Sequence, residues 1–188
     1  WYRHLTAPCL GAVEYEIETT AADAAGRVTR RTVAGRDYDY SYNARGQLAS
    51  YTDSANPLNN ATYTYDHLGR RIRATAGSDV TRFVYQGEDV VAEYVDLGGD
   101  GTVDRTRVYW TLPDLDQRIG FVDIDGAGNK TFYYYLCDQV GSVLQVVKAD
   151  GTVVSQYDYD AFGNIRPENT YETVENRYTF QGREWDAH

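Results

Sequence analysis

One phrase recurs along the sequence, and its repetition limits what the chain can fold into. Residues 157–165 read Tyr-Asp-Tyr-Asp-Ala-Phe-Gly-Asn-Ile, residues 63–69 read Tyr-Thr-Tyr-Asp-His-Leu-Gly, and residues 38–46 carry a looser copy. Each copy places tyrosines on one face of a strand and then opens a turn at Asp or Asn. Self-similarity at a regular spacing is typical of repeat architectures. We therefore expect each copy to be one strand–turn–strand unit.

Two kinds of turn alternate between the expected strands. In the first kind, Asp/Asn-x-x-Gly, the Asp or Asn accepts a backbone N–H bond and the Gly adopts positive φ, which closes a hairpin with a bulge. Its copies begin at Asp23, Asn43, Asp66, Asp138 and Asp160. The second kind is a tight Asp-Gly pair, a strong two-residue hairpin signal, at residues 100–101, 125–126 and 150–151. Alternating turns predict a meander whose strands have about five to eight residues.

The composition agrees with this fold class. The 188 residues include 18 Tyr and 17 Gly, and Tyr favours half-buried pleated surfaces. Tyr38, Tyr40 and Tyr42 lie at alternate positions, so one face of that strand is aromatic and the other is polar. A unit of this size cannot bury its aromatic face alone, and its neighbours must complete the core. The predicted fold is all-β, a meander of antiparallel β-hairpin repeats.

The charge of the chain excludes several partners. The formal net charge is −10, whereas a nucleic-acid-binding surface is basic. Apart from short clusters such as Arg27, Arg30 and Arg31, the sequence has no basic stretch, so we expect no nucleic-acid partner. An acidic chain is also disfavoured at an anionic membrane surface. No apolar run approaches the length of a membrane span, and no membrane insertion is expected.

Methionine and cysteine give two further expectations. The sequence contains no Met, which predicts that the chain is part of a longer translation product. Its two cysteines, Cys9 and Cys137, exclude a disulfide-dense scaffold. A single bridge between them and two free thiols both stay open as alternatives.

Several phrases resemble YD-repeat (Rhs) proteins, which are named for Tyr-Asp pairs such as those at 65–66 and 159–160. The most specific segments follow in the family's order and resemble the start of the Rhs repeat-associated core domain. They are residues 133–143 (Tyr-Tyr-Tyr-Leu-Cys-Asp-Gln-Val-Gly-Ser-Val), 149–154, 157–165 and 178–186 (Tyr-Thr-Phe-Gln-Gly-Arg-Glu-Trp-Asp). Cys137 stands where the family often has a polar residue or His.

On this basis we expect one continuous repeat domain with three parts. Residues 1–12 would form a partial N-terminal strand, residues 13–132 degenerate YD-type hairpin repeats, and residues 133–188 the start of an Rhs core-like segment. The resemblance implies that the sheet spirals into a hollow shell. In bacterial polymorphic toxins and Tc toxin C components such a shell encloses a C-terminal toxin domain, and in teneurins a similar barrel belongs to an adhesion receptor.

The resemblance therefore implies a non-enzymatic structural segment of a secreted or cell-surface protein. Its partners would be flanking repeats of the same chain, an enclosed C-terminal toxin domain, or other copies, since open sheet edges template pairing with other chains. The family's self-cleaving aspartate motif lies beyond the matched segment, so no catalytic residue is assigned. The alternative is a cell-surface adhesion module that binds a glycan or a receptor through exposed tyrosines and acidic loops.

One loop carries a candidate metal site, although no other cofactor is expected. Asp96, Asp100 and Asp104 occupy loop positions one, five and nine, a spacing that suits flexible oxygen ligands around calcium. Gly98 at position three and Arg107 at position twelve depart from the calcium-loop pattern. The alternative is an acidic hairpin tip in contact with solvent.

Two other acidic groups are weaker candidates for chemistry. Asp123, Asp125 and Asn129 form a partial echo of the calcium loop. Asp158 and Asp160 have the spacing of a pair of catalytic carboxylates. The repeat offers a simpler role for this pair, because Asp160 opens a turn and Asp158 lies on the polar face of the strand.

Overall fold

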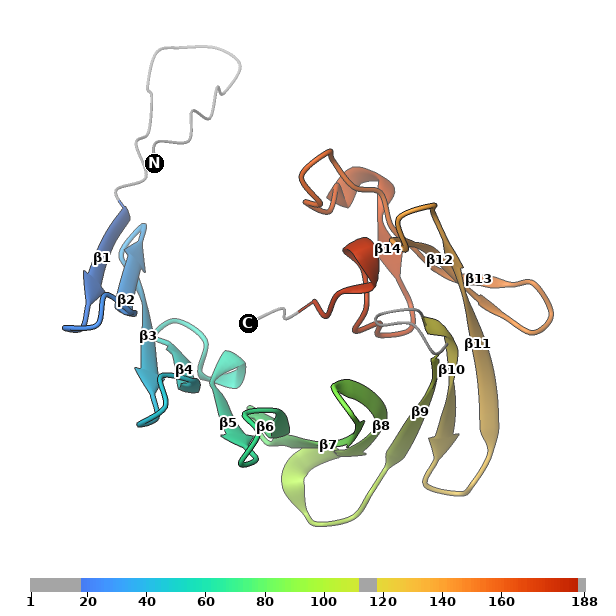
Figure 1. Cartoon of the computed structure of the whole chain (residues 1–188), viewed down its shortest axis with the longest axis horizontal. Coiled ribbons are helices and arrows are strands. Elements are labelled where there is room, and N and C mark those ends of the chain that lie inside the picture. Colours follow the sequence, from blue (N-terminus) through green and yellow to red (C-terminus); the bar gives the residue numbers. More distant parts are fainter. Residues whose placement is uncertain (1–17, 112–117, 186–188) are drawn as a thin grey trace. The chain divides into compact units, whose positions relative to one another are not determined.

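The computed structural model of the chain describes residues 18–111 and 118–185. Fourteen β-strands follow one another along this part of the chain, which contains four short 3-10 turns and no α-helix. None of these helical turns is long and apolar enough to cross a membrane. The chain divides into two compact units, one up to Ser78 and one from Asp79 onward (Figure 1). The predicted strand within residues 1–12, including Cys9, lies outside the described residues.

The first unit is an antiparallel meander, in which each strand pairs with the next along the chain. Its strands are β1 (Glu18–Ala22), β2 (Val28–Val33), β3 (Arg36–Tyr42), β4 (Leu48–Asp53), β5 (Ala61–Tyr65) and β6 (Arg71–Ala76). The 3-10 turn η1 (Pro57–Asn59) lies between β4 and β5.

The second unit continues the same topology over eight strands. They are β7 (Asp79–Gln86), β8 (Asp89–Asp96), β9 (Arg105–Thr111), β10 (Arg118–Asp125), β11 (Lys130–Cys137), β12 (Val143–Lys148), β13 (Val153–Gln156) and β14 (Tyr171–Glu172). The 3-10 turns are η2 (Leu97–Gly99), η3 (Pro167–Asn169) and η4 (Phe180–Gly182). The predicted all-β meander of antiparallel hairpins is confirmed.

The first kind of turn has the predicted chemistry, which Asp66 illustrates. Its Oδ1 accepts backbone N–H bonds from Leu68 and Arg70, both at 2.9 Å. Gly69 closes the turn with φ +92° and donates its N–H to the Asp66 carbonyl oxygen at 3.1 Å. The strand register shifts by one residue between Thr64 and Tyr65, as a bulge beside the turn requires.

The second kind of turn, a tight two-residue Asp-Gly hairpin, was predicted wrongly at all three places. The turn at 125–126 closes at Gly128, and the turn at 150–151 is a four-residue turn that begins at Lys148. In each of them a glycine with positive φ, Gly128 or Gly151, is the fourth residue. An Asp-Gly dipeptide can occupy different positions within a turn. Gly126 is the second residue of its turn and is not among the glycines with positive φ, whereas Gly151 is the fourth residue of its turn. The third predicted pair, at 100–101, lies in a longer loop between β8 and β9.

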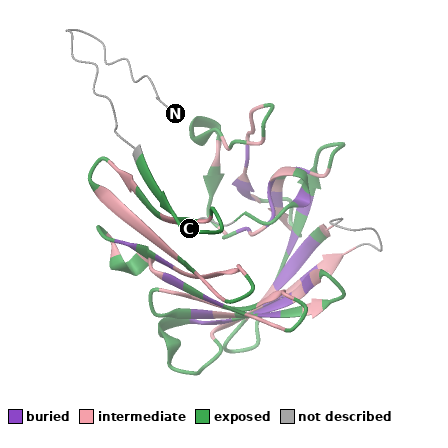
Figure 2. Ribbon diagram, turned by 60° about the vertical axis from the view of Figure 1, so that its left-hand side comes forward, coloured by how far each residue is buried: buried purple, intermediate pink, exposed green. Residues whose placement is uncertain are grey.

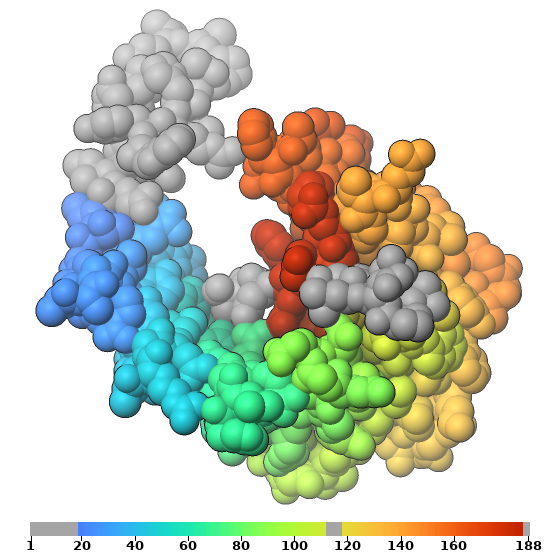
Figure 3. Space-filling model, in the orientation of Figure 1, coloured from blue at the N-terminus to red at the C-terminus, as the bar shows by residue number. Residues whose placement is uncertain are grey.

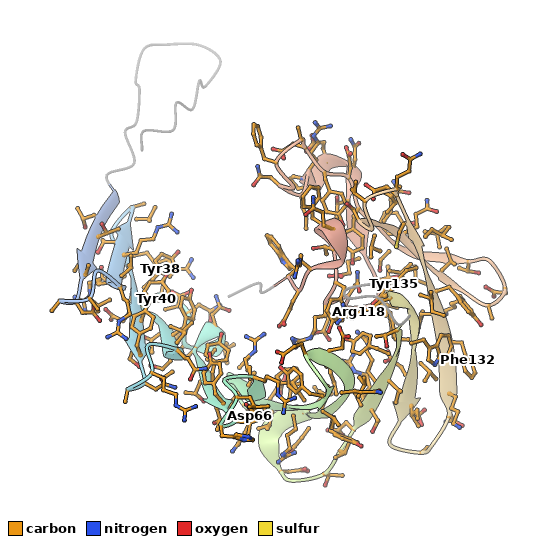
Figure 4. All side chains as sticks on the ribbon, viewed as in Figure 1. Tyr38, Tyr40, Asp66, Arg118, Phe132 and Tyr135 are labelled. Carbon is orange, nitrogen blue, oxygen red and sulfur yellow. The ribbon has the colours of Figure 1, made fainter. Side chains whose placement is uncertain are left out.

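Tyrosines make the core of the first unit. Tyr51, Ala61 and Tyr63 are buried, and partly buried side chains from β3 and β4 pack against them. The ring centroids of Tyr38 and Tyr51 lie 6.2 Å apart, and those of Tyr40 and Tyr51 lie 5.6 Å apart. Tyr38 and Tyr40 are therefore on one face of β3, as their alternation predicts (Figure 4).

The second unit buries a second aromatic row on one face of β9, β10 and β11. Phe121 is fully buried, and its ring lies 4.8 Å from that of Tyr133 and 6.0 Å from that of Tyr109. Figure 2 colours the buried residues purple, and they lie on several strands, including β8, whose pattern contains five of them. Phe132 alternates with this row and is 39% exposed on the opposite face. Cys137, at the end of β11, is an exposed free thiol.

Candidate functional site

A C-terminal strap, residues 173–185, lies across the buried aromatic face of the second unit (Figures 1 and 3). It begins after β14, where the Thr173 N–H donates to the Val154 carbonyl oxygen on β13 at 3.0 Å. Further along, the Thr179 carbonyl oxygen accepts the Val143 N–H of β12 at 3.1 Å. Figure 4 shows Tyr135 pointing toward the strap, whereas Phe132 points to the other side of the sheet.

A buried carboxylate is at the centre of this site. Glu93 on β8 is 4% exposed, and its Oε1 accepts bonds from the Tyr109 hydroxyl at 2.7 Å and from Arg177 Nε at 2.6 Å. Arg177 belongs to the strap, also donates to Glu184 at 2.5 Å, and lies 4.3 Å from the ring centroid of Phe83. Burial alone would lower the pKa of Arg177, but the two carboxylates raise it, so the guanidinium stays charged.

A second arginine joins two strands to the strap. Arg107 on β9 is 1% exposed and binds Asp123 of β10 through two bonds of 2.7 and 2.8 Å. Its remaining terminal nitrogen donates to the Glu175 carbonyl oxygen at 2.7 Å, and Arg105 binds the Glu175 carboxylate at the same distance. The guanidinium carbon of Arg107 lies 4.0 Å from the ring centroid of Phe121. Two-bond guanidinium–carboxylate pairs fix orientation as well as charge.

A third arginine, Arg118 on β10, holds the far part of the strap. It donates to the Gly182 carbonyl oxygen at 3.4 Å and to Asp89 of β8 at 3.1 Å. Its guanidinium carbon lies 3.7 Å from the ring centroid of Tyr178, a cation–π arrangement. The Tyr178 ring also meets Tyr109 edge-on, with centroids 5.1 Å apart.

Tyrosine hydroxyls complete the contacts from β11 and from the segment after β13. The Tyr135 hydroxyl donates to Asn176 Oδ1 at 2.8 Å, and the Tyr157 hydroxyl donates to the Glu172 carboxylate. Glu172 in turn accepts the backbone N–H of Asn176 at 2.8 Å. Burial raises the pKa of Tyr135 well above its ordinary value, so this phenol stays neutral.

The strap therefore has hydrogen-bonded contacts with six successive strands, from β8 to β13. It crosses the strands rather than extending the sheet. Loss of one partner of a buried ion pair strongly destabilises a protein, because the other charge is left unpaired away from water. The strap therefore holds these strands at fixed positions relative to one another.

The predicted calcium loop lies between β8 and β9, beside the strap site. Asp96 is 1% exposed. Asp96, Asp100 and Asp104 each accept a backbone N–H bond from within the loop, at 3.1, 2.7 and 2.7 Å respectively. Among the described residues, no three carboxylate, His or Cys side chains are grouped so as to hold a metal ion. Calcium at this loop stays a prediction.

A carboxylate from outside the loop binds the loop backbone. Asp79, at the start of β7, accepts the backbone N–H of Gly98 at 2.8 Å. Gly98 is the loop position at which the sequence lacks a ligand. Sequence spacing could not reveal Asp79. Its neighbour Val80 on β7 pairs with Asp96 on β8, and this strand pairing brings Asp79 to the loop.

The weaker acidic candidates have structural partners. Asp123 binds Arg107, and Asp125 caps its own turn, where Asn129 Nδ2 donates to Asp125 Oδ2 at 2.9 Å. The carboxylates of Asp123 and Asp125 are thus each bound by a neighbouring side chain.

The pair at 158 and 160 is likewise engaged in local structure. Asp160 caps the turn that it opens, and Asn164 Nδ2 donates to its Oδ2 at 2.7 Å. This side-chain bond and the backbone N–H of Asn164 lower the pKa of Asp160. Asp158 accepts a bond from Asn169 Nδ2 at 2.8 Å.

Sequence reasoning missed the charges of the strap site, namely the buried Glu93 and Arg107 and the half-buried Arg118 and Arg177. One signal was present, because Arg105, Arg107 and Tyr109 alternate and so share a face. The partners themselves carried no local signal, since 84 residues separate Arg177 from Glu93.

Comparison with curated proteins identifies relatives of the chain. It is 30% identical over 157 residues to the "tRNA3(Ser)-specific nuclease WapA" of Bacillus spizizenii, a match that covers 83% of this chain and 6% of the relative. It is 26% identical over 128 residues to Teneurin-3 of Danio rerio, which covers 67% of this chain and 4% of the relative. The chain thus spans a small part of the curated relatives that it matches.

Solved structures share the fold. The crystal structure of TcdB2-TccC3-TEV matches with a TM-score of 0.57 at 15% identity, over 93% of this chain and 10% of that one. The Tc holotoxin pore of Photorhabdus luminescens matches with a TM-score of 0.55 at 14% identity, over 90% and 11%. The family model described as Teneurin YD-shell matches residues 11–175. The YD-repeat resemblance is confirmed, and the chain belongs to the teneurin YD-shell family.

Proposed function

We propose that this chain is a non-enzymatic wall segment of a YD-repeat (Rhs) shell, which encloses a toxin domain carried further along the same protein. The strap is the observation that supports this proposal. Arg107, Arg118 and Arg177 hold residues 173–185 against one face of the sheet. A segment that follows the strap in a longer protein would therefore start from this face, which would be the inner face of the shell.

The names of the relatives fit this proposal. WapA of Bacillus spizizenii is named as a nuclease, and this chain corresponds to 6% of its length. We infer that the toxic activity of such a protein lies outside this segment. The charged groups of the strap site support this inference, because Glu93, Arg107 and Arg177 are engaged in buried ion pairs. The purified chain should leave tRNA intact, and cleavage that disappears in Glu93→Gln would overturn the inference.

Protection from protease tests the enclosure of a toxin domain. The longer natural protein is treated with protease, beside a separately expressed sample of its C-terminal domain. We expect the C-terminal domain to survive within the longer protein and to be digested when separate. Equal digestion of both samples would contradict the proposal.

Adhesion and localisation are separate expectations of the same protein. A shell protein of this kind would be secreted or displayed on the cell surface, which fractionation of the producing cells would show. The adhesion alternative requires accessible tyrosines. Tyr51, Tyr63 and Tyr109 are buried in the sheet cores. Tyr94, Tyr134 and Tyr171 are exposed and would be the tyrosines available to a ligand. Specific binding on a glycan array would favour adhesion over enclosure.

A further inference from the structure

Strands β9 and β10 are joined differently from the strands that follow them in the second unit. Strands β10 to β13 are linked by short connections, residues 126–129, 138–142 and 149–152, and short turns fix the register of a hairpin. Residues 112–117 separate β9 from β10, which is longer than the hairpin loops of about two to five residues whose geometry fixes a register. The register of β9 against β10 therefore needs another determinant.

A slip by two residues is the alternative that the two sheet faces allow. Side chains alternate along a strand, so a one-residue slip exchanges the faces, whereas a two-residue slip keeps each side chain on its own face. On the face away from the strap, Val108 pairs with Val122 and Trp110 pairs with Gly120. Val122 can pack against any apolar neighbour, and Gly120 has no side chain that would exclude one. This face therefore does not select a register.

The face that the strap covers carries a pair that does select one. Arg107 lies directly opposite Asp123. Their side chains are 1% and 15% accessible and are joined by two bonds of 2.7 and 2.8 Å. Arg107 is also directly opposite Glu93 on β8, so a charged row crosses three strands at one level. A guanidinium and a carboxylate joined by two bonds have a fixed mutual orientation.

A two-residue slip in either direction breaks this pair. One slip places Arg107 opposite Phe121, and the other places Asp123 opposite Tyr109. Each moves β9 along β10 by about 7 Å, since a strand rises by about 3.3 Å per residue. Loss of one partner of a buried ion pair is strongly unfavourable, so both slips are penalised and the observed register is favoured.

We propose that the Arg107–Asp123 pair, in place of a turn, fixes the register in which β9 joins β10, and that this register positions the strap. Arg107 donates to the Glu175 carbonyl oxygen at 2.7 Å, whereas Arg118 on β10 holds the Gly182 carbonyl oxygen. A slip would displace these two anchors relative to each other, and the strap could not reach both. The consequence for a segment that follows the strap rests on the proposed function.

Disulfide cross-linking on the face away from the strap reports the register. Directly opposite residues of antiparallel strands have Cα atoms about 4.5–5.5 Å apart, which a disulfide can span, whereas neighbours shifted by two residues are about 7–8 Å apart, beyond its usual reach. The observed register is reported by Val108→Cys with Val122→Cys. The two slips are reported by Thr106→Cys with Val122→Cys and by Val108→Cys with Ile124→Cys.

The direction of the slip can be predicted for Asp123→Leu. All cross-linking is done with Cys9→Ser and Cys137→Ser, which remove both natural thiols. The variant leaves Asp125 as the next carboxylate of β10 on the strap face, and Arg107 lies opposite Asp125 in the slip that the 108–124 cross-link reports. We expect Asp123→Leu to accelerate the 108–124 cross-link at least about tenfold, because the observed register loses its ion pair. The 106–122 cross-link should accelerate less.

Two further variants separate a slip from general loosening, and circular dichroism shows which variants are folded. Asp123→Asn keeps an acceptor oxygen for Arg107, so it should fold and accelerate the 108–124 cross-link by a smaller factor. Arg177→Met weakens the strap but keeps the Arg107–Asp123 pair, so the slipped cross-links should stay as slow as in the unmodified chain. Slipped cross-links that stay slow in both Asp123 variants, or that accelerate equally in Arg177→Met, would overturn the proposal. If Asp123→Leu is unfolded, Asp123→Asn decides.

Register and enclosure fail in different measurements. Slipped cross-links that respond to the Asp123 variants, in a protein whose C-terminal domain is digested freely, would eliminate enclosure alone. Slipped cross-links that do not respond, in a protein that protects its C-terminal domain, would eliminate the register role of the Arg107–Asp123 pair alone.

Discussion

The Tyr65 hydroxyl donates a hydrogen bond of 2.8 Å to the backbone carbonyl oxygen of Leu48. Leu48 is the second residue after the Gly of the preceding Asp/Asn-x-x-Gly turn, and Tyr65 immediately precedes the next such turn. The same bond joins Tyr42 to Val28 at 2.8 Å and Tyr159 to Val143 at 2.7 Å. The Tyr-Asp pair of the repeat thus has two physical roles: its Tyr ties one hairpin to the previous one, and its Asp caps the turn.

Removing this hydroxyl should weaken the repeat by a modest amount. We expect Tyr65→Phe to lower the free energy of unfolding by about 1 kcal/mol, since the Leu48 carbonyl loses its partner while the ring packing is kept. Urea denaturation measures the difference. Tyr134→Phe, at a site that is 40% exposed on the other face of the sheet in the second unit, is the control. Equal stability of Tyr65→Phe and the unmodified chain would show that the hydrogen bond adds nothing to the free energy of unfolding.

Breaking the central ion pair of the strap should have a larger effect. Arg177→Met leaves the Glu93 carboxylate buried with the Tyr109 hydroxyl alone, and loss of one partner of a buried pair costs about 3–5 kcal/mol. Urea denaturation should show this loss, and protease should cut within residues 173–185. Arg30→Met is the matched control, because the Arg30–Asp39 pair is exposed, with side chains 53% and 44% accessible. A similar small loss in both variants would contradict a central role for the strap.

Glycine is required at position 120 on β10 because the backbone of β11 lies very close to it. A Cβ at this position would collide with the Tyr133 carbonyl oxygen on β11. The absence of a side chain also lets Trp110 and Tyr134, the cross-strand neighbours of Gly120, bring their ring centroids to 5.6 Å. We expect Gly120→Ala to cost at least about 3 kcal/mol, at the upper end for overpacking.

The control for this substitution is Gly151→Ala. Gly151 has φ +85° and no atom within 4 Å of an added Cβ, so only the left-handed backbone opposes Ala there, at about 1–2 kcal/mol. Thermal unfolding of the two variants compares the costs. A smaller loss for Gly120→Ala than for Gly151→Ala would contradict the steric argument.

Alkaline pH should destabilise the second unit through its buried tyrosines. Burial raises the pKa of Tyr109 and Tyr135 well above the ordinary value, which is about 10 in an unfolded chain. Their contribution to stability is therefore complete below about pH 10 and is lost as the pH rises above that value, because the unfolded state releases these protons first.

Urea midpoints measured on both sides of this pH should show the loss, and Tyr135→Phe should show a shallower dependence on pH. Tyrosinate absorbance should also rise at higher pH in the folded protein than in urea. Identical absorbance titrations of the two states would contradict this prediction.

Calcium at the loop of residues 96–104 can be tested directly. If Asp96, Asp100 and Asp104 bind calcium with help from Asp79, the ion stabilises the folded chain by mass action. We expect a higher melting temperature in calcium than in chelator, and no difference in Asp79→Asn with Asp104→Asn. Equal melting temperatures of the unmodified chain in both conditions would remove the calcium prediction.

Local features of this protein could be predicted from its sequence. The turn at Asp66 depends on bonds to Leu68 and Arg70 within the same turn, and such bonds follow from residue type and spacing. The aromatic face of β3 follows from the alternation of Tyr38 and Tyr40, because side chains on a strand point to opposite faces in turn. Position within a turn was harder to predict, as the Asp-Gly pair at 125–126 shows, since the same dipeptide fits more than one turn.

The strap site could not be predicted in the same way. Arg177 meets Glu93 only because the chain turns back after β14 and crosses the sheet, and nothing near either residue signals the other. The sequence by itself determined the repeat unit, its turns and its aromatic face, because neighbouring residues decide them. The tertiary structure alone decided which buried charges meet. A charge is stable inside a protein only beside a partner, and in the strap site the partners are far apart in the sequence.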